Sequence, residues 1–126
     1  MHPAEPPAER SGQVTRDYAA QHADPIAVAA GEPFTVTDRH DAWEDNPAWI
    51  WVSCSDARGK RGWVPQSIIQ LAPDGVTGTT AEPYDARELT VRTGETLTIE
   101  QEAAGWYWCR EAQGRRGWVP VSHVRV

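Results

Sequence analysis

The feature of this sequence that most constrains its fold is an internal repeat. Residues 59–65, which read Gly-Lys-Arg-Gly-Trp-Val-Pro, return at residues 114–120 as Gly-Arg-Arg-Gly-Trp-Val-Pro. Upstream of these blocks, residues 31–36 match residues 94–99, so the blocks occur in the same order in both copies. A repeat of this kind indicates that one supersecondary unit occurs twice along the chain. We therefore predict two homologous domains.

Two further blocks complete the alignment of the copies. Residues 49–52 are placed opposite residues 106–109, because each segment carries a pair of Trp residues separated by one position. Tyr18 is placed opposite Tyr84, near the start of each copy. The spacings between blocks differ, and differences confined to the gaps indicate that the blocks are strands and the gaps are loops.

These blocks set the expected domain boundaries. We expect the first domain to span residues 12–71 and the second to span residues 76–126, joined by a short turn-like linker at residues 72–75. Residues 1–11 are rich in Pro and Glu, which is typical of a disordered tail.

The local patterns favour an all-β fold. Residues 34–36 and 97–99 alternate apolar and polar side chains, as expected for strands buried on one face. Short connections at residues 56–59 and 111–114 contain Gly and suit hairpins. Each copy is therefore expected to be a small antiparallel β-domain.

The order of the blocks resembles the Src homology 3 (SH3) domain. That family opens with a tyrosine-containing strand, continues through a long hairpin called the RT loop and an n-Src loop to a Trp-containing strand, and ends on Gly-Trp-x-Pro. Both copies carry the ending, at residues 62–65 and 117–120. The resemblance implies two tandem SH3-like domains, each a five-stranded antiparallel barrel.

SH3 domains bind proline-rich peptides in the polyproline II form, laid over a shelf of aromatic rings. The resemblance implies such a shelf in each copy, with Trp49 and Trp106 as the central rings. His123 takes the place of a family tyrosine and can still stack, while Trp43 in the n-Src loop either caps the groove beside Trp49 or covers the neighbouring domain. The residues expected to contact a ligand are Tyr18, Trp43, Trp49, Pro65, Tyr84, Trp106, Pro120 and His123.

Charge and chemistry disfavour several other classes of protein. The formal net charge of −6 disfavours binding to nucleic acids and to anionic membranes. Cys54 and Cys109 lack metal-ligand spacing and are expected to be free thiols. We find no catalytic motif and no metal or cofactor motif, so we do not expect an enzyme. No segment is apolar enough to span a bilayer and the start does not read as a signal peptide, so the cytoplasm is the expected location.

Three functions are compatible with this reading. The leading one is an adaptor whose SH3-like domains bind a partner protein or a short peptide, proline-rich or not. The second is a cell-wall module that binds peptidoglycan peptides, because the Ala- and Arg-rich composition indicates a bacterial source. The third is a structural tandem or dimer whose grooves are occluded. The sequence leaves the oligomeric state open.

Overall fold

The computed structural model describes residues 9–22 and 24–126, and the chain divides into two compact units. One is the continuous unit, His22–Arg87, and the other is the split unit, which consists of Met1–Gln21 together with Glu88–Val126. Both units consist of antiparallel strands and single-turn 3-10 helices, so the predicted all-β fold class is confirmed.

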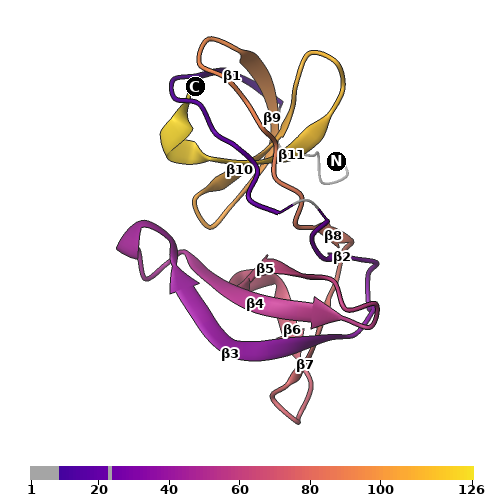
Figure 1. The fold of residues 1–126 in the computed structure, drawn as a ribbon. Coiled ribbons are helices and arrows are strands. Elements are labelled where there is room, and N and C mark those ends of the chain that lie inside the picture. Colours follow the sequence, from indigo (N-terminus) through magenta and orange to yellow (C-terminus); the bar gives the residue numbers. More distant parts are fainter. Residues whose placement is uncertain (1–8, 23) are drawn as a thin grey trace, which may run out of the picture. The chain divides into compact units, whose positions relative to one another are not determined.

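The continuous unit contains a five-stranded antiparallel sheet in the order β5-β4-β3-β7-β6 and a two-stranded ribbon of β2 and β8 (Figure 1). Its 3-10 turns are η1 (Trp43–Asp45) and η2 (Gln66–Ile68). Its strands are β2 (Ala27–Val28), β3 (Phe34–Ala42), β4 (Ile50–Asp56), β5 (Arg61–Pro65), β6 (Ile69–Leu71), β7 (Thr77–Thr80) and β8 (Tyr84–Asp85).

The split unit contains a second five-stranded antiparallel sheet, in the order β11-β10-β9-β1-β12. A 3-10 turn, η3 (Val121–His123), separates its last two strands. Its strands are β1 (Arg10–Val14), β9 (Thr96–Ala103), β10 (Trp106–Arg110), β11 (Arg116–Pro120) and β12 (Val124–Arg125).

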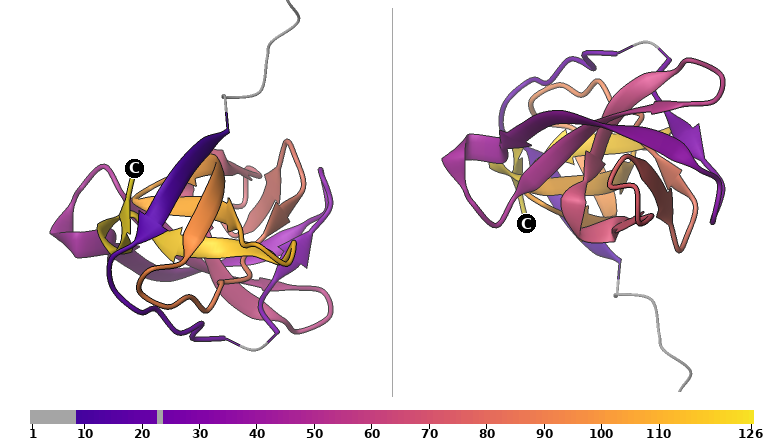
Figure 2. Two further views of the ribbon diagram at one scale, coloured as in Figure 1. Left: turned by 90° about the horizontal axis from the view of Figure 1, so that it is seen from above. Right: turned by 90° about the horizontal axis from the view of Figure 1, so that it is seen from below.

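The first strand of each repeat pairs with strands of the other repeat. Strand β1 comes from the first repeat, yet it lies between β9 and β12 of the second, with Gly12 opposite Leu97 and Gln13 opposite Arg125. Figure 2 shows the indigo β1 beside the orange β9 and the yellow β12. Conversely β7, from the second repeat, pairs with β3 and β6 of the first. The compact units are therefore not the contiguous stretches of the sequence repeat.

The segment expected to link two domains, residues 72–75, is a tight turn between β6 and β7 of the continuous unit. The backbone N–H of Ala72 donates to the carbonyl of Thr77 at 2.8 Å. Asp74 Oδ1 accepts the backbone N–H groups of Val76 and Thr77, both at 2.8 Å, and Gly75 adopts a φ of 70°. An Asp that bonds its own turn, followed by Gly at positive φ, is a strong reversal signal.

In each unit, an acidic residue also stabilises the turn of the hairpin that follows the Trp-containing strand. Glu111 Oε1 accepts the backbone N–H of Arg115 at 2.9 Å, and Asp56 Oδ1 accepts that of Lys60 at 3.0 Å. The pKa of the Glu111 carboxyl lies below its ordinary value, mainly because of the backbone hydrogen bond from Arg115. A hydrogen bond to the charged form of a carboxylate favours ionisation.

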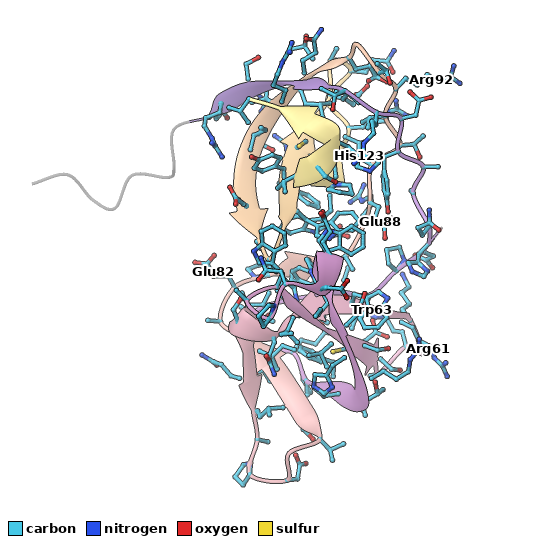
Figure 3. All side chains as sticks on the ribbon, turned by 90° about the vertical axis from the view of Figure 1, so that its left-hand side faces the viewer. Arg61, Trp63, Glu82, Glu88, Arg92 and His123 are labelled. Atoms are coloured by element: carbon cyan, nitrogen blue, oxygen red, sulfur yellow. The ribbon has the colours of Figure 1, made fainter. Side chains whose placement is uncertain are left out.

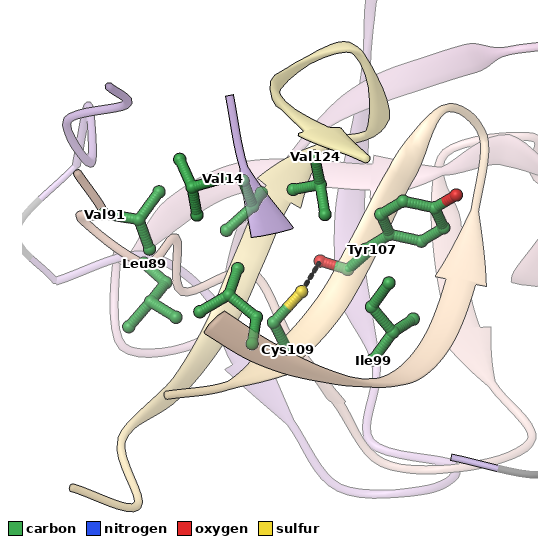
Figure 4. Packing of buried hydrophobic residues seen from close by; sticks show 9 residues of the cluster. Val14, Leu89, Val91, Ile99, Tyr107, Cys109 and Val124 are labelled. Carbon is green, nitrogen blue, oxygen red and sulfur yellow. Dashed lines mark hydrogen bonds between the residues drawn. The ribbon is translucent and has the colours of Figure 1, made fainter. Parts of the chain in front are cut away.

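The core of the split unit draws on both of its chain segments (Figure 4). Cys109 packs at its centre, and its Sγ donates to the carbonyl of Tyr107 at 3.7 Å. The cluster consists of Val14, Leu89, Val91, Leu97, Ile99, Tyr107, Cys109, Val119 and Val124. Full burial of an aliphatic side chain contributes about 1.5–3 kcal/mol to stability. The buried side chain of Val14 therefore stabilises the packing of β1 against the second repeat.

The core of the continuous unit forms around Phe34 and Val52, which are 3% and 2% exposed. A Cβ placed on Gly78 of β7 would lie 2.8 Å from Phe34 Cε2 and 3.1 Å from Ile69 Cγ2. A methyl group has no room there, so glycine lets β7 approach these side chains. Gly12 of β1 has the same role in the split unit.

Most of the expected disordered tail, residues 1–11, lies outside the described residues, although Arg10 already begins β1. Within the described part of the chain, no helix is long and apolar enough to cross a membrane.

Candidate functional site

The split unit brings four of the expected ligand contacts together. The ring of Tyr18 meets Trp106 edge-on, with centroids 5.5 Å apart and planes at 84°. It meets His123 in the same way, again at 5.5 Å and 84°. Trp106 lies opposite Pro120 in the ladder between β10 and β11. We call Tyr18, Trp106, Pro120 and His123 the split-unit shelf.

Tyr18 is held in this shelf by residues of the second repeat. Its backbone N–H donates to the carbonyl of Val91 at 2.9 Å, and the N–H of Val91 returns a bond of 2.8 Å. One residue earlier, Asp17 Oδ1 accepts the backbone N–H of Thr93 at 2.7 Å and its hydroxyl at 2.9 Å. The shelf therefore combines a tyrosine of the first repeat with the Trp, Pro and His of the second.

A carboxylate lies at the edge of the split-unit shelf. Glu88 Oε1 accepts the hydroxyl of Tyr18 and the backbone N–H of Gln21, the latter at 3.0 Å. Burial, with help from Glu88, raises the pKa of the Tyr18 hydroxyl well above its ordinary value, so Tyr18 stays neutral and donates. His123 Nδ1 lies 3.3 Å from the carbonyl of Arg16 (Figure 3 labels Glu88 and His123).

The continuous unit holds a second set of aromatic residues. Trp51 lies opposite Pro65 in the ladder between β4 and β5. The Tyr84 hydroxyl donates to the carbonyl of Trp63 at 2.8 Å, and the backbone of Tyr84 pairs with Val28. Tyr84 therefore belongs to the unit built mainly from the first repeat.

A family comparison accounts for this architecture. The model of the variant SH3 domain matches residues 11–72 and, a second time, residues 76–126. The chain belongs to the SH3 domain family. The fold predicted from the repeat, two SH3 domains in one chain, is thus confirmed.

Several known SH3 proteins are similar to this chain. It is 24% identical to SH3 and PX domain-containing protein 2B of Homo sapiens over 127 residues, which cover 89% of this chain and 13% of that protein. It is 25% identical to Protein BZZ1 of Schizosaccharomyces pombe, over 97% of this chain and 20% of that protein. It is also 25% identical to human Intersectin-1, over 71% of this chain and 6% of that protein. The chain thus spans a fifth or less of these relatives, which are eukaryotic and give no support to the bacterial source expected from composition.

The register of the SH3 strands corrects the alignment of the Trp segments. Trp51 and Trp106 lie opposite Pro65 and Pro120, so Trp51, and not Trp49, is the counterpart of Trp106. The alignment from sequence was wrong by two residues. Its signal was present, because Trp51 stands as far before the Gly-Trp-Val-Pro block as Trp106 does.

The same register shows that the two cysteines occupy equivalent positions of the repeat. Cys54 lies opposite Gly62 as Cys109 lies opposite Gly117, so Cys109 corresponds to Cys54 and not to Val52. Both cysteines are buried free thiols, as expected from sequence. Burial raises the pKa of each thiol to about 12, so neither is a ready nucleophile.

The structure also regroups the predicted SH3 shelves. Tyr18 was expected beside Trp49 and Pro65, but it lies beside Trp106 and His123. Tyr84 was expected beside Trp106, but its strand pairs with β2 in the continuous unit. The reason is the exchanged pairing of β1 and β7, which carries each tyrosine into the unit of the other repeat.

Trp43 and Trp49 lie at the two ends of the n-Src loop of the continuous unit. The backbone N–H of Trp43 donates to the carbonyl of Trp49 at 2.8 Å, and that of Trp49 donates to Asn46 at 2.9 Å. Both indoles are half-buried. A ligand-binding role for Trp43 or Trp49 stays a prediction.

The described residues contain no cluster of His, Cys, Asp and Glu that could hold a metal ion. The chemistry that the split-unit shelf offers is recognition, through the half-buried rings of Tyr18 and His123 and the carboxylate of Glu88 at its edge. Pro120 is fully buried and Trp106 is largely so; Pro65, its counterpart in the continuous unit, is fully buried too.

Proposed function

We propose that this protein is a non-enzymatic cytoplasmic adaptor whose SH3 units bind a peptide segment of a partner protein. Membership of the SH3 family supports protein binding in general. The observation that carries the finer proposal is the split-unit shelf, where the Tyr18 ring packs in T-shaped geometry against Trp106 and against His123. Proline rings pack on such aromatic faces, and a polyproline II ligand loses little entropy on docking because it is already stiff.

The carboxylate of Glu88 supports a preference for a basic residue beside the prolines. Glu88 is half-exposed and already accepts the Tyr18 hydroxyl, so its carboxyl group is held in position at the shelf edge. A ligand Arg would form a charge-assisted hydrogen bond there, which is stronger than a neutral one. Neither nucleic acid nor an anionic membrane fits a chain of net charge −6.

The test is an NMR titration of the full chain with a synthetic proline-rich peptide that carries one Arg. We expect weak binding, with a dissociation constant on the order of 100 μM or weaker. Shift changes should centre on Tyr18, Trp106 and His123. Trp106→Phe should weaken binding severalfold, whereas Trp108→Phe, two residues further along β10, serves as the matched control. No shift changes at millimolar peptide, or equal effects of both variants, would contradict the proposal.

The low exposure of the central indoles favours a structural role as the second candidate. Trp51 and Trp106 are only 6% and 8% exposed. A tandem whose grooves are covered would present no shelf to a peptide. The structural role is supported if the peptide fails to bind while both units remain cooperatively folded.

A further inference from the structure

The strand pairing of the two units implies an exchange between equivalent strands. Gly12 lies opposite Leu97 in the split unit, and Gly78 lies opposite Phe34 in the continuous unit. Leu97 and Phe34 occupy the same position of the sequence repeat, two residues after the Glu of its Gly-Glu pair. Strands β1 and β7 are therefore the same strand of the SH3 fold, and each completes the sheet of the other repeat.

The exchange gives the two units different chain orders. The continuous unit begins with β2 from the RT loop of the first repeat and ends with β7 and β8, the opening strand and RT arm of the second. It is thus a circularly permuted SH3 domain. The split unit keeps the strand order of the family. The sequence of the continuous unit is inserted into the RT loop of the split unit, between residues 21 and 88.

The side-chain pattern of β1 and β7 does not determine whether each strand pairs with the other repeat (exchanged) or with its own repeat (self-paired). Each strand brings one glycine into close contact with its partner core: Gly12 against Val124 and Ile99, Gly78 against Phe34 and Ile69. Either strand would therefore fit either sheet. The discrimination has to come from how the strands are connected.

We propose that the turn at residues 72–75 commits the chain to this exchange. Strands β6 and β7 are consecutive in the chain, and in the SH3 fold the last and first strands lie side by side. The turn, bonded by Asp74, delivers β7 directly beside β6 with Leu71 opposite Gly78. Four extended residues reach at most about 14 Å, whereas closing a tight hairpin costs little chain entropy. Once β7 fills the first sheet, β1 is left for the second.

The exchange has a consequence for the split-unit shelf. Tyr18 reaches Trp106 only because β1 and the residues after it run through the split unit. A self-paired chain would place Tyr84 beside Trp106 instead. The length of the turn at residues 72–75 therefore determines whether Tyr18 or Tyr84 lies beside Trp106.

Paired cysteines in the full chain test the exchange. Residues opposite each other in an antiparallel ladder have Cα atoms about 4.5–5.5 Å apart, within disulfide reach. Ser11 lies opposite Thr98, and Thr77 lies opposite Thr35. The exchanged chain should oxidise in S11C/T98C and in T77C/T35C, whereas a self-paired chain should oxidise in S11C/T35C. The buried native thiols, with pKa values of about 12, stay out of the reaction.

The readout is peptide mapping of the disulfide in the monomer and dimer fractions from size exclusion. We expect the Ser11–Thr98 and Thr77–Thr35 positions to link within one chain and the Ser11–Thr35 positions not to link. A Ser11–Thr35 link, a Ser11–Thr98 link between two chains, or no link in either expected pair would each overturn the exchange.

A second variant tests the role of the turn. An insert of about ten Gly and Ser residues after Pro73 raises the root-mean-square reach of the segment to about 20 Å. The Ser11–Thr35 link should then appear, at the expense of Ser11–Thr98. An insert of one residue is the matched control and should preserve the exchanged links. If the long insert leaves the exchanged links unchanged, the turn does not determine the pairing.

Discussion

Gly12 offers a thermodynamic test of where β1 lies. An added Cβ would sit 2.6 Å from Val124 Cγ1 and 3.0 Å from Ile99 Cδ1. Ordinary carbon contacts are about 3.5–4.0 Å, so the neighbouring valine has to move by about 1 Å. Overpacking of this kind costs about 1–3 kcal/mol, and we expect Gly12→Ala to lower the free energy of unfolding of the split unit by that amount.

A double-mutant cycle isolates the contact. Val124→Ala should cost about 2 kcal/mol through lost burial and the cavity that remains. Because Val124→Ala also removes the methyl that collides with the new Cβ, Gly12→Ala should cost much less in that background. We expect a coupling of about 1–2 kcal/mol, within the range found for residues in contact. The altered entropy of the unfolded chain cancels in the cycle.

The matched control is Ile69→Ala. Ile69 Cγ2 would lie 3.1 Å from a Cβ on Gly78, so it occupies the place that Val124 occupies beside Gly12. In the exchanged chain, Gly12→Ala and Ile69→Ala should add within about 0.5 kcal/mol. The assay is urea unfolding followed by NMR peak intensities of each unit. Coupling of Gly12 to Ile69, and none to Val124, would refute the placement of β1.

Three further predictions concern ionisable groups. Because burial and the nearby carboxylate raise the pKa of Tyr18, its contribution to stability should be complete below about pH 10 and fall at higher pH; Tyr18→Phe should flatten that alkaline decline in urea unfolding. Because the backbone N–H of Arg115 lowers the pKa of Glu111, stability should be lost as the pH falls below about 4, and Glu111→Gln should reduce this loss in acid titrations. Cys54 and Cys109 should react with a disulfide reagent at pH 8 only as fast as the protein unfolds; a rapid phase in native protein would contradict their burial.

Much of the fold follows from local pattern. The alternation around Phe34 and Leu97 and the repeated Gly-Trp-Val-Pro block were sufficient to predict an all-β chain with two SH3 domains. Leu97, Ile99 and Cys109 lie in one core, as their apolar positions indicate. These features follow from patterns within a few residues of the chain, because local alternation of apolar and polar residues indicates a strand and its buried face directly.

Strand partnership was harder to predict. Strands β1 and β7 carry equivalent patterns, including a close-packed glycine, so neither composition nor periodicity says which sheet each joins. The clue was the turn chemistry of Asp74 and Gly75, which marks a hairpin and not an extended linker. The assignment of Trp49 went wrong for a different reason: two Trp residues flank Ile50, and the spacing to the Gly-Trp-Val-Pro block, which agrees with the cross-strand register, was not used to choose between them.

The split unit has a consequence for the order in which the protein can fold. Residues 22–87 emerge from the ribosome as one uninterrupted segment and include every strand of the continuous unit. Strand β1 is made before the continuous unit, yet its partner β12 is made only after that unit, with Gln13 opposite Arg125. Contacts between positions so distant in sequence form slowly, because the entropy lost on closing the long intervening loop opposes them. We therefore expect the continuous unit to fold during synthesis, while β1 stays unpaired until β9 and β12 have been made.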